Sequence, residues 1–247
     1  SSDVCSSDLG SVITGGKEIG PPGFRYVRDE NVVQPLLTGE LPPIAEGSAF
    51  PDTMVFTRGE ARSAVLARMQ KAQSQLLAQL WETRAENLPL QSPDEALILA
   101  SIIEKETGVT DERGMVAGVF INRLRLGMLL QTDPSVVYGI EVAQGGAPLG
   151  RALTRADLQR DTPYNTYMRA GLTPTPICLP GRASLEAALH PATTDALYFV
   201  ARGDGSGTHI FSADLKAHNA AVRAYIEKPF DPKTLRAKIQ ESIKPAV

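Results

Sequence analysis

The amino-acid sequence predicts an α+β fold, in which a helix-rich domain carries a small β-hairpin. Apolar residues recur at helical spacing in long segments between residues 62 and 126. Two short apolar runs, at 196–200 and 208–211, flank a glycine-rich turn, which is typical of an antiparallel hairpin. The 247 residues are 43% hydrophobic and 21% charged, a composition that allows a globular core.

Three helices are expected in the first half of the chain. The first spans residues 62–86 and the third spans residues 111–126, each with one apolar face. The second has the clearest boundaries. It begins with a capping box from Ser92 to Glu95, with proline at the first helical position, and it ends at Gly108. This second helix also carries the residues that matter most below.

The second half of the chain is expected to be less regular. Residues 127–181 form a long, proline-punctuated loop with a short helix at 154–159, and long ordered loops are usually functional. A short helix at 184–190 precedes the hairpin, and a helix at 214–225 follows it. The functional domain is therefore predicted to span residues 47–225.

The two ends do not fit this domain. Residues 1–10 lack any periodicity and resemble a translated sequencing adapter, so they are interpreted as an artefact and excluded from the fold. Residues 11–46 are rich in glycine and proline and predict loop with one or two short strands. Residues 226–247 predict a peripheral tail helix of foreign character.

Composition excludes several classes of function. A net charge of -3 provides no basic field, so nucleic acid is not an expected partner. Two cysteines do not make a disulfide framework, and Cys178 lies in an apolar stretch that favours simple burial. The three histidines lack the close spacing of metal ligands, so neither a metal nor another cofactor is predicted. No apolar run of about 18 residues is present, so no transmembrane helix is predicted.

Glu106, at the end of the second helix, is the strongest catalytic candidate. At about 100° per residue, its face of the helix is shared by Leu99, Ile102 and Ile103, whereas Glu104 lies on a less apolar side. A carboxyl group on an apolar face is partly desolvated, which raises its pKa. An acid that cleaves glycosidic bonds needs this property, because it must keep its proton near neutral pH. The alternative is a solvated helix end without function.

A second cluster of candidates precedes and enters a helix marked by Pro134. Gln131, Thr132, Asp133 and Tyr138 are candidates for substrate binding. For Asp133 the simpler interpretation is that it caps the helix. Gln131 has less structural reason to be there and suits hydrogen bonding to a substrate.

A third cluster lies in the long loop, where Tyr164 and Tyr167 bracket Asn165. Tyrosine faces stack on sugar rings, and an asparagine amide suits hydroxyl and acetamido groups. The alternative is a packed loop in which both tyrosines are covers.

Together these segments resemble the endolytic murein transglycosylases of the MltG (YceG-like) family. The resemblance runs from about residue 37 to residue 225. The matching segments are residues 46–47, 50–53, 100–107, 119–124, 130–134, 164–167, 171–172, 174–177 and 188–191.

The resemblance implies a catalytic role for the second glutamate of a Glu-Lys-Glu motif, which is Glu106. Family members have an N-terminal membrane anchor and a LysM-like segment, so residues 11–46 would be a remnant of that segment. They act on the periplasmic face of the cytoplasmic membrane, where they release nascent glycan strands. The parent protein would therefore have a single-pass anchor that this soluble fragment lacks. Peptidoglycan strands are the implied substrate, and the wall-synthesis machinery is a further candidate partner.

The implied reaction is a lytic transglycosylation. It cleaves the β-1,4 bond between N-acetylmuramic acid (MurNAc) and N-acetylglucosamine (GlcNAc) and leaves 1,6-anhydro-MurNAc ends. Glu106 would act as acid and then as base, and Glu104 joins the two clusters above as a substrate-binding candidate. Three alternatives stay open. They are a lysozyme-type hydrolase with Asp133 as nucleophile or base, an inactive wall-binding module and, more remotely, a metalloenzyme.

Overall fold

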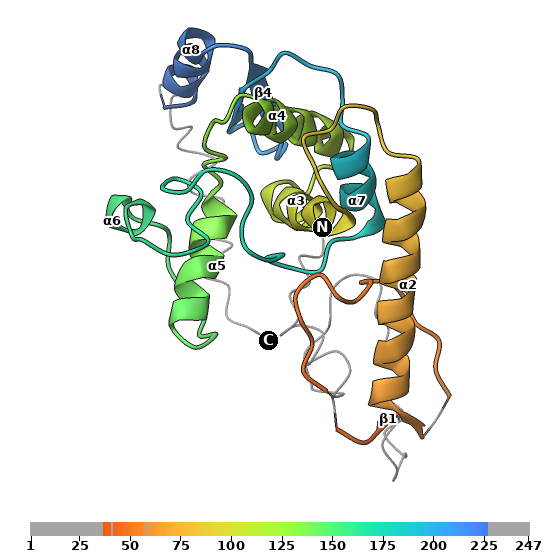
Figure 1. The fold of residues 1–247 in the computed structure, drawn as a ribbon. Coiled ribbons are helices and arrows are strands. Elements are labelled where there is room, and N and C mark those ends of the chain that lie inside the picture. Colours follow the sequence, from red (N-terminus) through yellow and green to blue (C-terminus); the bar gives the residue numbers. More distant parts are fainter. Residues whose placement is uncertain (1–36, 41, 58, 227–247) are drawn as a thin grey trace.

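The computed structural model describes residues 37–40, 42–57 and 59–226 (Figure 1). The predicted α+β class is confirmed, because helices dominate and the strands form two small sheets. The helices are α2 (Arg62–Glu82), α3 (Pro93–Glu106), the 3-10 turn η1 (Thr110–Glu112), α4 (Arg113–Arg125), α5 (Asp133–Ala143), α6 (Arg155–Leu158), α7 (Arg182–Leu189) and α8 (Leu215–Ile226). The strands are β1 (Leu37–Thr38), β2 (Glu60–Ala61), β3 (Tyr198–Ala201) and β4 (His209–Ser212).

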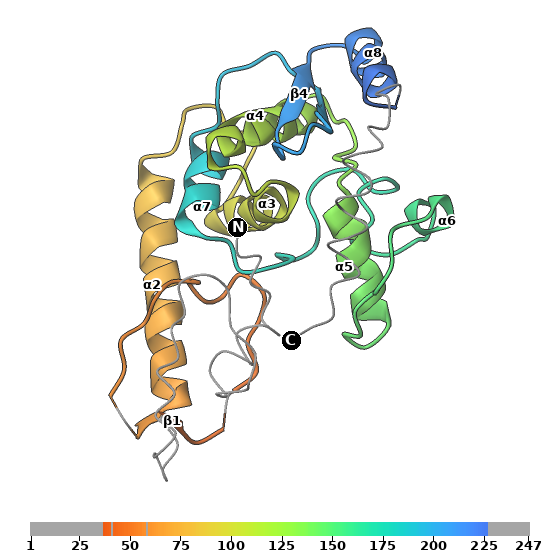
Figure 2. The same cartoon turned by 180° about the vertical axis from the view of Figure 1, so that it is seen from behind.

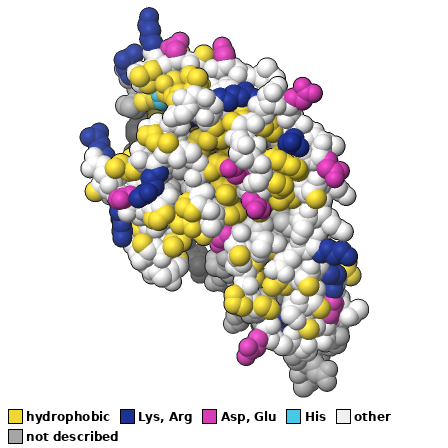
Figure 3. Space-filling model, in the orientation of Figure 1, with side chains coloured by type: hydrophobic (Ala, Val, Ile, Leu, Met, Phe, Trp, Pro, Cys, Tyr) yellow, Lys and Arg dark blue, Asp and Glu magenta, His cyan; other side chains and the backbone are white. Residues whose placement is uncertain are grey.

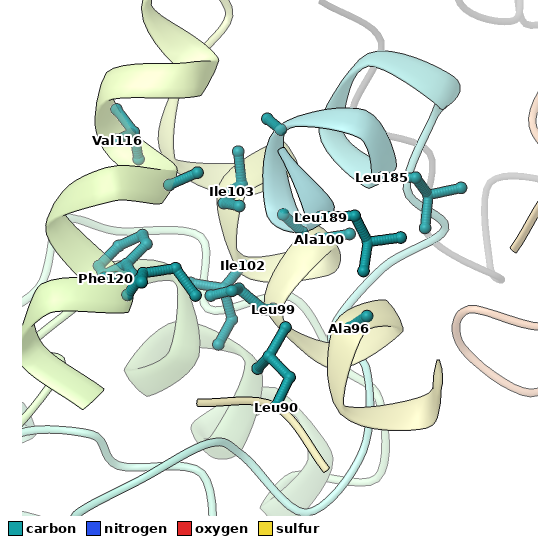
Figure 4. Close-up of a cluster of buried hydrophobic side chains, with 14 of the residues drawn as sticks. Leu90, Ala96, Leu99, Ala100, Ile102, Ile103, Val116, Phe120, Leu185 and Leu189 are labelled. Atoms are coloured by element: carbon teal, nitrogen blue, oxygen red, sulfur yellow. The ribbon is translucent and has the colours of Figure 1, made fainter. Parts of the chain in front are cut away.

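Helix α3 lies at the centre of the main core, between α4 and α7 (Figure 4). Its start follows the predicted signals. The Ser92 side chain accepts a hydrogen bond from the Glu95 N–H at 3.3 Å, and proline occupies the first helical position. The Glu95 carboxylate reaches back to the N–H of Gln91 at 2.6 Å, one residue further than in a capping box. The largest fully buried side chains of this core include Leu99, Ile102 and Ile103.

Helices α2 and α5 lie on opposite sides of α3, as the two opposite views show (Figures 1 and 2). Helix α2 ends at Glu82, earlier than the predicted residue 86. Beyond it the Ala85 N–H donates to the Leu189 carbonyl at 2.9 Å, and Asn87 adopts a left-handed φ of 58°. This tertiary hydrogen bond to the end of α7 takes the chain away from the helix axis.

A second, smaller core lies at the other end of α2. The parallel pair β1–β2 closes it, with Leu37 opposite Glu60. This pairing gives residues just before the predicted functional domain a place against α2. The buried residues of this core are Leu37, Ala49, Val65, Leu66, Met69 and Leu179.

Strands β3 and β4 form the predicted antiparallel hairpin, shifted by one or two residues along the chain. Asn122 in α4 fixes the approach to β3, because its side-chain amide donates to the carbonyls of Thr194 and Ala196 at 2.9 and 3.1 Å. Helix α8 packs on both strands. The hairpin is thereby held beside the C-terminal end of α4.

The expectations for residues 1–10 and for most of residues 11–46 fall outside the described residues, as does the tail after Ile226. Within the described part of the chain, no helix combines the length and apolar character needed to cross a membrane. The face shown in Figure 3 carries acidic and basic side chains scattered among hydrophobic ones.

Candidate active site

A cavity of about 170 Å³ lies at the C-terminal end of α3. It collects side chains from segments far apart in the sequence, including α3, α4, the loop before α5, and β3. Four of the predicted site residues meet there, and the other three lining residues were not predicted as site residues. The lining residues are Glu106, Arg123, Leu130, Gln131, Asp133, Tyr167 and Phe199.

Glu106 is partly buried at the last position of α3. Burial is the main influence on its pKa and raises it, and the neighbouring Asp133 carboxylate raises it further. A hydrogen bond from the Thr132 hydroxyl, together with electrostatic attraction from His209 and Arg123, acts in the opposite direction. Because burial outweighs the opposing effects, the structure favours the protonated acid.

Two backbone hydrogen bonds hold Thr132 in a position from which its hydroxyl contacts Glu106. Its N–H donates to Thr166 Oγ1 at 3.0 Å, and its carbonyl accepts from Ser135 Oγ at 2.8 Å. Its hydroxyl then donates to Glu106 Oε2 at 2.7 Å. Thr132 is also the N-cap residue of α5, yet its side chain makes no capping hydrogen bond. The Thr132 hydroxyl is therefore hydrogen-bonded to the Glu106 carboxyl group and not to the backbone of α5.

Asp133 does not cap α5, contrary to the simpler interpretation of the sequence, because Thr132 occupies the N-cap position. The Asp133 carboxylate is exposed at the cavity and accepts a hydrogen bond from the Tyr167 hydroxyl at 2.5 Å. Burial and this hydrogen bond raise the pKa of Tyr167, so its hydroxyl remains a donor.

Gln131 lies in the cavity wall with a φ of 52°, a left-handed conformation that non-glycine residues rarely adopt. Its N–H donates to the Thr166 carbonyl at 3.1 Å, which helps to hold this backbone. Local strain of this kind concentrates at functional sites, because surrounding contacts must stabilise it.

Arg123 also lines the cavity, although the sequence showed it only as part of a family motif. It is 7% exposed. Its Nε donates to the Leu197 carbonyl at 2.7 Å and its Nη1 to the Leu130 carbonyl at 2.8 Å. One sequence signal could have identified it, since Arg123 follows Val116 and Phe120 on the apolar face of α4. A charged residue in such a stripe requires polar partners.

A further ionisable pair lies beside Phe199. Nδ1 of His209 is 2.8 Å from the Glu112 carboxylate, which also accepts the His209 N–H at 2.9 Å. The His209 ring packs edge-on against Phe199, with 5.4 Å between ring centroids. The two partners are 97 residues apart, so no local sequence pattern could have paired them.

With this geometry established, comparison with known proteins gives a consistent result. The profile of the YceG-like family matches residues 16–224. The chain belongs to the YceG-like family. The endolytic murein transglycosylase of Bacillus subtilis (strain 168) is 38% identical over 181 residues, which cover 73% of this chain and 48% of that protein.

Two further relatives agree. The endolytic murein transglycosylase of Streptococcus pneumoniae serotype 2 is 34% identical over 162 residues, covering 63% of this chain and 28% of that protein. A 2.6 Å crystal structure of a YceG-like protein from Listeria monocytogenes superposes with a TM-score of 0.59 at 36% identity. That match covers 70% of this chain and 54% of the Listeria chain. The chain thus spans about half the length of its Bacillus relative, and less of the Streptococcus protein.

Five predicted substrate-binding residues of this YceG-like chain are not among the residues that line the cavity, namely Glu104, Thr132, Tyr138, Tyr164 and Asn165. Tyr138 and Tyr164 pack edge to face, with ring centroids 4.9 Å apart. Asn165 is fully buried, and its amide group donates to the carbonyls of Leu158 and Arg160 at 3.1 and 2.7 Å. For Tyr164 and Asn165 these contacts correspond to the packed-loop alternative, and Asn165 Oδ1 also accepts the Tyr167 N–H at 2.9 Å.

Glu104 is also placed away from the cavity. It is 6% exposed, and it accepts hydrogen bonds from Ser184 Oγ at 2.6 Å and the Gly181 N–H at 3.0 Å. The Arg113 guanidinium lies 3.7 Å from its other oxygen. The sequence placed Glu104 on a less apolar side of the helix, and in the structure α7 covers this side and buries the carboxylate.

Proposed function

We propose that the chain is an endolytic peptidoglycan lytic transglycosylase that cleaves the β-1,4 bond between MurNAc and GlcNAc. The observation that carries this proposal is the environment of Glu106, a carboxyl group at the wall of an open cavity whose pKa is raised by burial. The Bacillus and Streptococcus relatives, both named endolytic murein transglycosylases, support the same reaction class. Nascent glycan strands at the periplasmic face of the cytoplasmic membrane are the proposed substrate, and cleavage would terminate them.

In the first step, Glu106 donates its proton to the glycosidic oxygen as the bond from that oxygen to muramoyl C1 breaks. In the second step, the Glu106 carboxylate takes the proton of the muramoyl C6 hydroxyl while the C6 oxygen bonds to C1. The product is a 1,6-anhydro-MurNAc end, and no water is consumed. One group can serve as acid and then base when its pKa lies near the working pH.

Neighbouring residues support both protonation states of Glu106. Burial favours the acid, whereas the Thr132 hydroxyl and the Arg123 charge stabilise the carboxylate formed between the two steps. Gln131, Asp133 and Tyr167 line the same cavity and would hold the sugars through their polar atoms.

A second candidate function is a lysozyme-type hydrolysis, because Asp133 lines the same cavity and could act as nucleophile or base. Mass spectrometry of products from purified glycan strands separates the two reactions. Hydrolysis adds one water for each bond cleaved, whereas transglycosylation leaves the summed mass unchanged. We expect anhydro ends only.

The assignment of Glu106 is tested with Glu106→Gln, which keeps the side-chain shape and an acceptor for Thr132 but has no acidic proton. Anhydro products should disappear with this variant and persist with Glu82→Gln, a change at an exposed residue of α2. Full activity of Glu106→Gln would rule out Glu106 as the acid. Glycan binding without turnover by the wild-type protein would favour an inactive wall-binding module.

A further inference from the structure

Arg123 has a donor that the protein itself does not use. Its Nε and Nη1 donate to backbone carbonyls, and Nη1 also lies 3.5 Å from the Gln131 side-chain oxygen. Among the described residues, no atom accepts a hydrogen bond from Nη2. Arg123 lines the cavity, and Nη2 is not among the fully buried side-chain atoms that lack a partner, so this nitrogen is open to a ligand there.

A guanidinium nitrogen that has no protein acceptor is left to solvent or to a ligand. Burial of the group lowers the pKa of Arg123, although the group stays charged. The ring of Tyr198, 5.2 Å from the guanidinium carbon, contributes an attraction but no lone pair. A ligand oxygen placed at Nη2 would complete the hydrogen bonding.

The charged residues that line the cavity indicate which kind of ligand oxygen would bind to Arg123 Nη2. Arg123 is the one cationic group among the lining residues, and Asp133 and Glu106 are the acidic ones. The guanidinium favours an anionic or strongly polarised acceptor, and it offsets repulsion of such a group by the Asp133 carboxylate.

We propose that Arg123 Nη2 binds an acyl oxygen of the lactyl group on the muramoyl residue beside Glu106, and thereby selects that sugar at the cleaved bond. This inference rests on the proposed function. MurNAc differs from GlcNAc only by its 3-O-lactyl ether, so a donor that recognises this ether distinguishes the two sugars. The lactyl oxygen belongs to a carboxylate on bare strands and to an amide where a peptide is attached. Both are acceptors for a guanidinium.

The test compares two ligands of equal length in the full chain carrying Glu106→Gln, which removes turnover. One is a bare tetrasaccharide of alternating MurNAc and GlcNAc, and the other is chitotetraose, which lacks the lactyl groups. A charge-assisted hydrogen bond predicts that calorimetry gives about 10- to 100-fold tighter binding of the muramoyl ligand. If the variant with Arg123 intact binds the two ligands with nearly equal affinity, the inference is overturned.

The second measurement adds Arg123→Lys, which keeps the charge but loses the planar fork. The ratio should fall to about threefold or less, because a single ammonium engaged by the Leu130 carbonyl has no donor fixed toward the lactyl group. Arg125→Lys is the matched control, since Arg125 lies in the same helix, outside the cavity, and donates to the Asn87 carbonyl. Equal weakening of both ligands by Arg123→Lys would indicate a structural role and contradict the inference.

A muramoyl tetrasaccharide with peptides attached distinguishes the two forms of the lactyl oxygen. If Nη2 binds the amide as well, Arg123→Lys should also reduce its advantage over chitotetraose. Failure of the proposed function would look different. In that case the wild-type protein makes no anhydro ends from glycan strands, whatever the affinity ratio.

Discussion

The Thr132 hydroxyl donates a hydrogen bond to Glu106 Oε2 at 2.7 Å, which joins the start of α5 to the end of α3 across 26 residues of sequence. This bond is the largest of the influences that lower the pKa of Glu106, and it acts against the burial that raises it. The balance between the two sets the proton affinity of the proposed acid.

Thr132→Val should therefore change both the rate and its pH dependence. Valine has nearly the shape of threonine but cannot donate to the carboxylate, so the pKa of Glu106 should rise further. The alkaline limb of the pH–rate profile should move to higher pH, since Glu106 must start protonated. Loss of a hydrogen bond to a charged group should reduce kcat by about 10- to 100-fold.

Thr132→Ser is the control, because serine keeps the hydroxyl that donates to Glu106. Its pH–rate profile should match that of the wild-type protein. If Thr132→Val slows the reaction without moving the alkaline limb, the hydroxyl acts on the substrate and not on the acid.

The raised pKa of Glu106 should also appear in the stability of the fold. The folded protein retains a proton that the unfolded chain releases near the ordinary carboxyl pKa of 4.5. The contribution of Glu106 to stability is therefore fully present below that pKa and is lost as pH rises through the folded pKa.

Glutamine does not titrate, so Glu106→Gln does not lose stability by ionisation at this position. The Tm of the variant should therefore rise relative to that of the wild-type protein as pH rises from about 4.5 to 8. Thermal unfolding monitored by circular dichroism at several pH values measures the difference. Glu82→Gln, at an exposed position, should show no comparable trend. A Tm difference that is constant with pH would contradict the raised pKa.

Glu104 should matter for stability and not for substrate affinity. Removing one partner of a buried charged pair leaves the other uncompensated, so Glu104→Ala should lower the free energy of unfolding by about 3–5 kcal/mol. Urea unfolding measures this loss. The milder Glu104→Gln can still accept from Ser184 and the Gly181 N–H, and at low temperature its KM should equal that of the wild-type protein. A raised KM in this folded variant would assign Glu104 to substrate binding.

The contact of α4 with the segment before the hairpin predicts opposite effects for two glycines one turn apart. A Cβ at Gly118 would lie 2.7 Å from both the Ala192 carbonyl oxygen and the Thr194 methyl group. Gly118→Ala should therefore cost about 1–3 kcal/mol. A Cβ at Gly114 would be 3.7 Å from Ala192, an ordinary contact, so Gly114→Ala should add about 0.4–1 kcal/mol. Equal effects of the two changes in urea unfolding would disprove this packing.

Local patterns predicted much of this architecture. The capped start of α3, the glycine-rich hairpin and the placement of Glu106 all depend on residues a few positions apart, and the structure contains each of them. Gln131, which had little structural reason at its position, and Tyr167, a candidate for stacking on sugars, both line the cavity.

Contacts between distant segments could not be predicted in this way. The helical wheel placed Glu104 on a less apolar side of α3, but it could not show that α7 covers this side, because Ser184 of α7 is 80 positions later in the sequence. The Glu112–His209 pair depends on a separation of 97 residues. The apolar face of α4 could have drawn attention to Arg123, but the carbonyls that its guanidinium contacts come from two different segments and could not be predicted.

The hydrogen bond between Glu104 and Ser184 has a consequence for synthesis on the ribosome. The apolar side of α3 is completed only by α7, so it remains uncovered while about 80 further residues are translated. Such delayed long-range closure slows folding and leaves apolar surface open to association with other chains. A nascent chain that has emerged only as far as α5 therefore carries both Glu106 and Thr132, yet it lacks the covering helix that fixes α3 in the core.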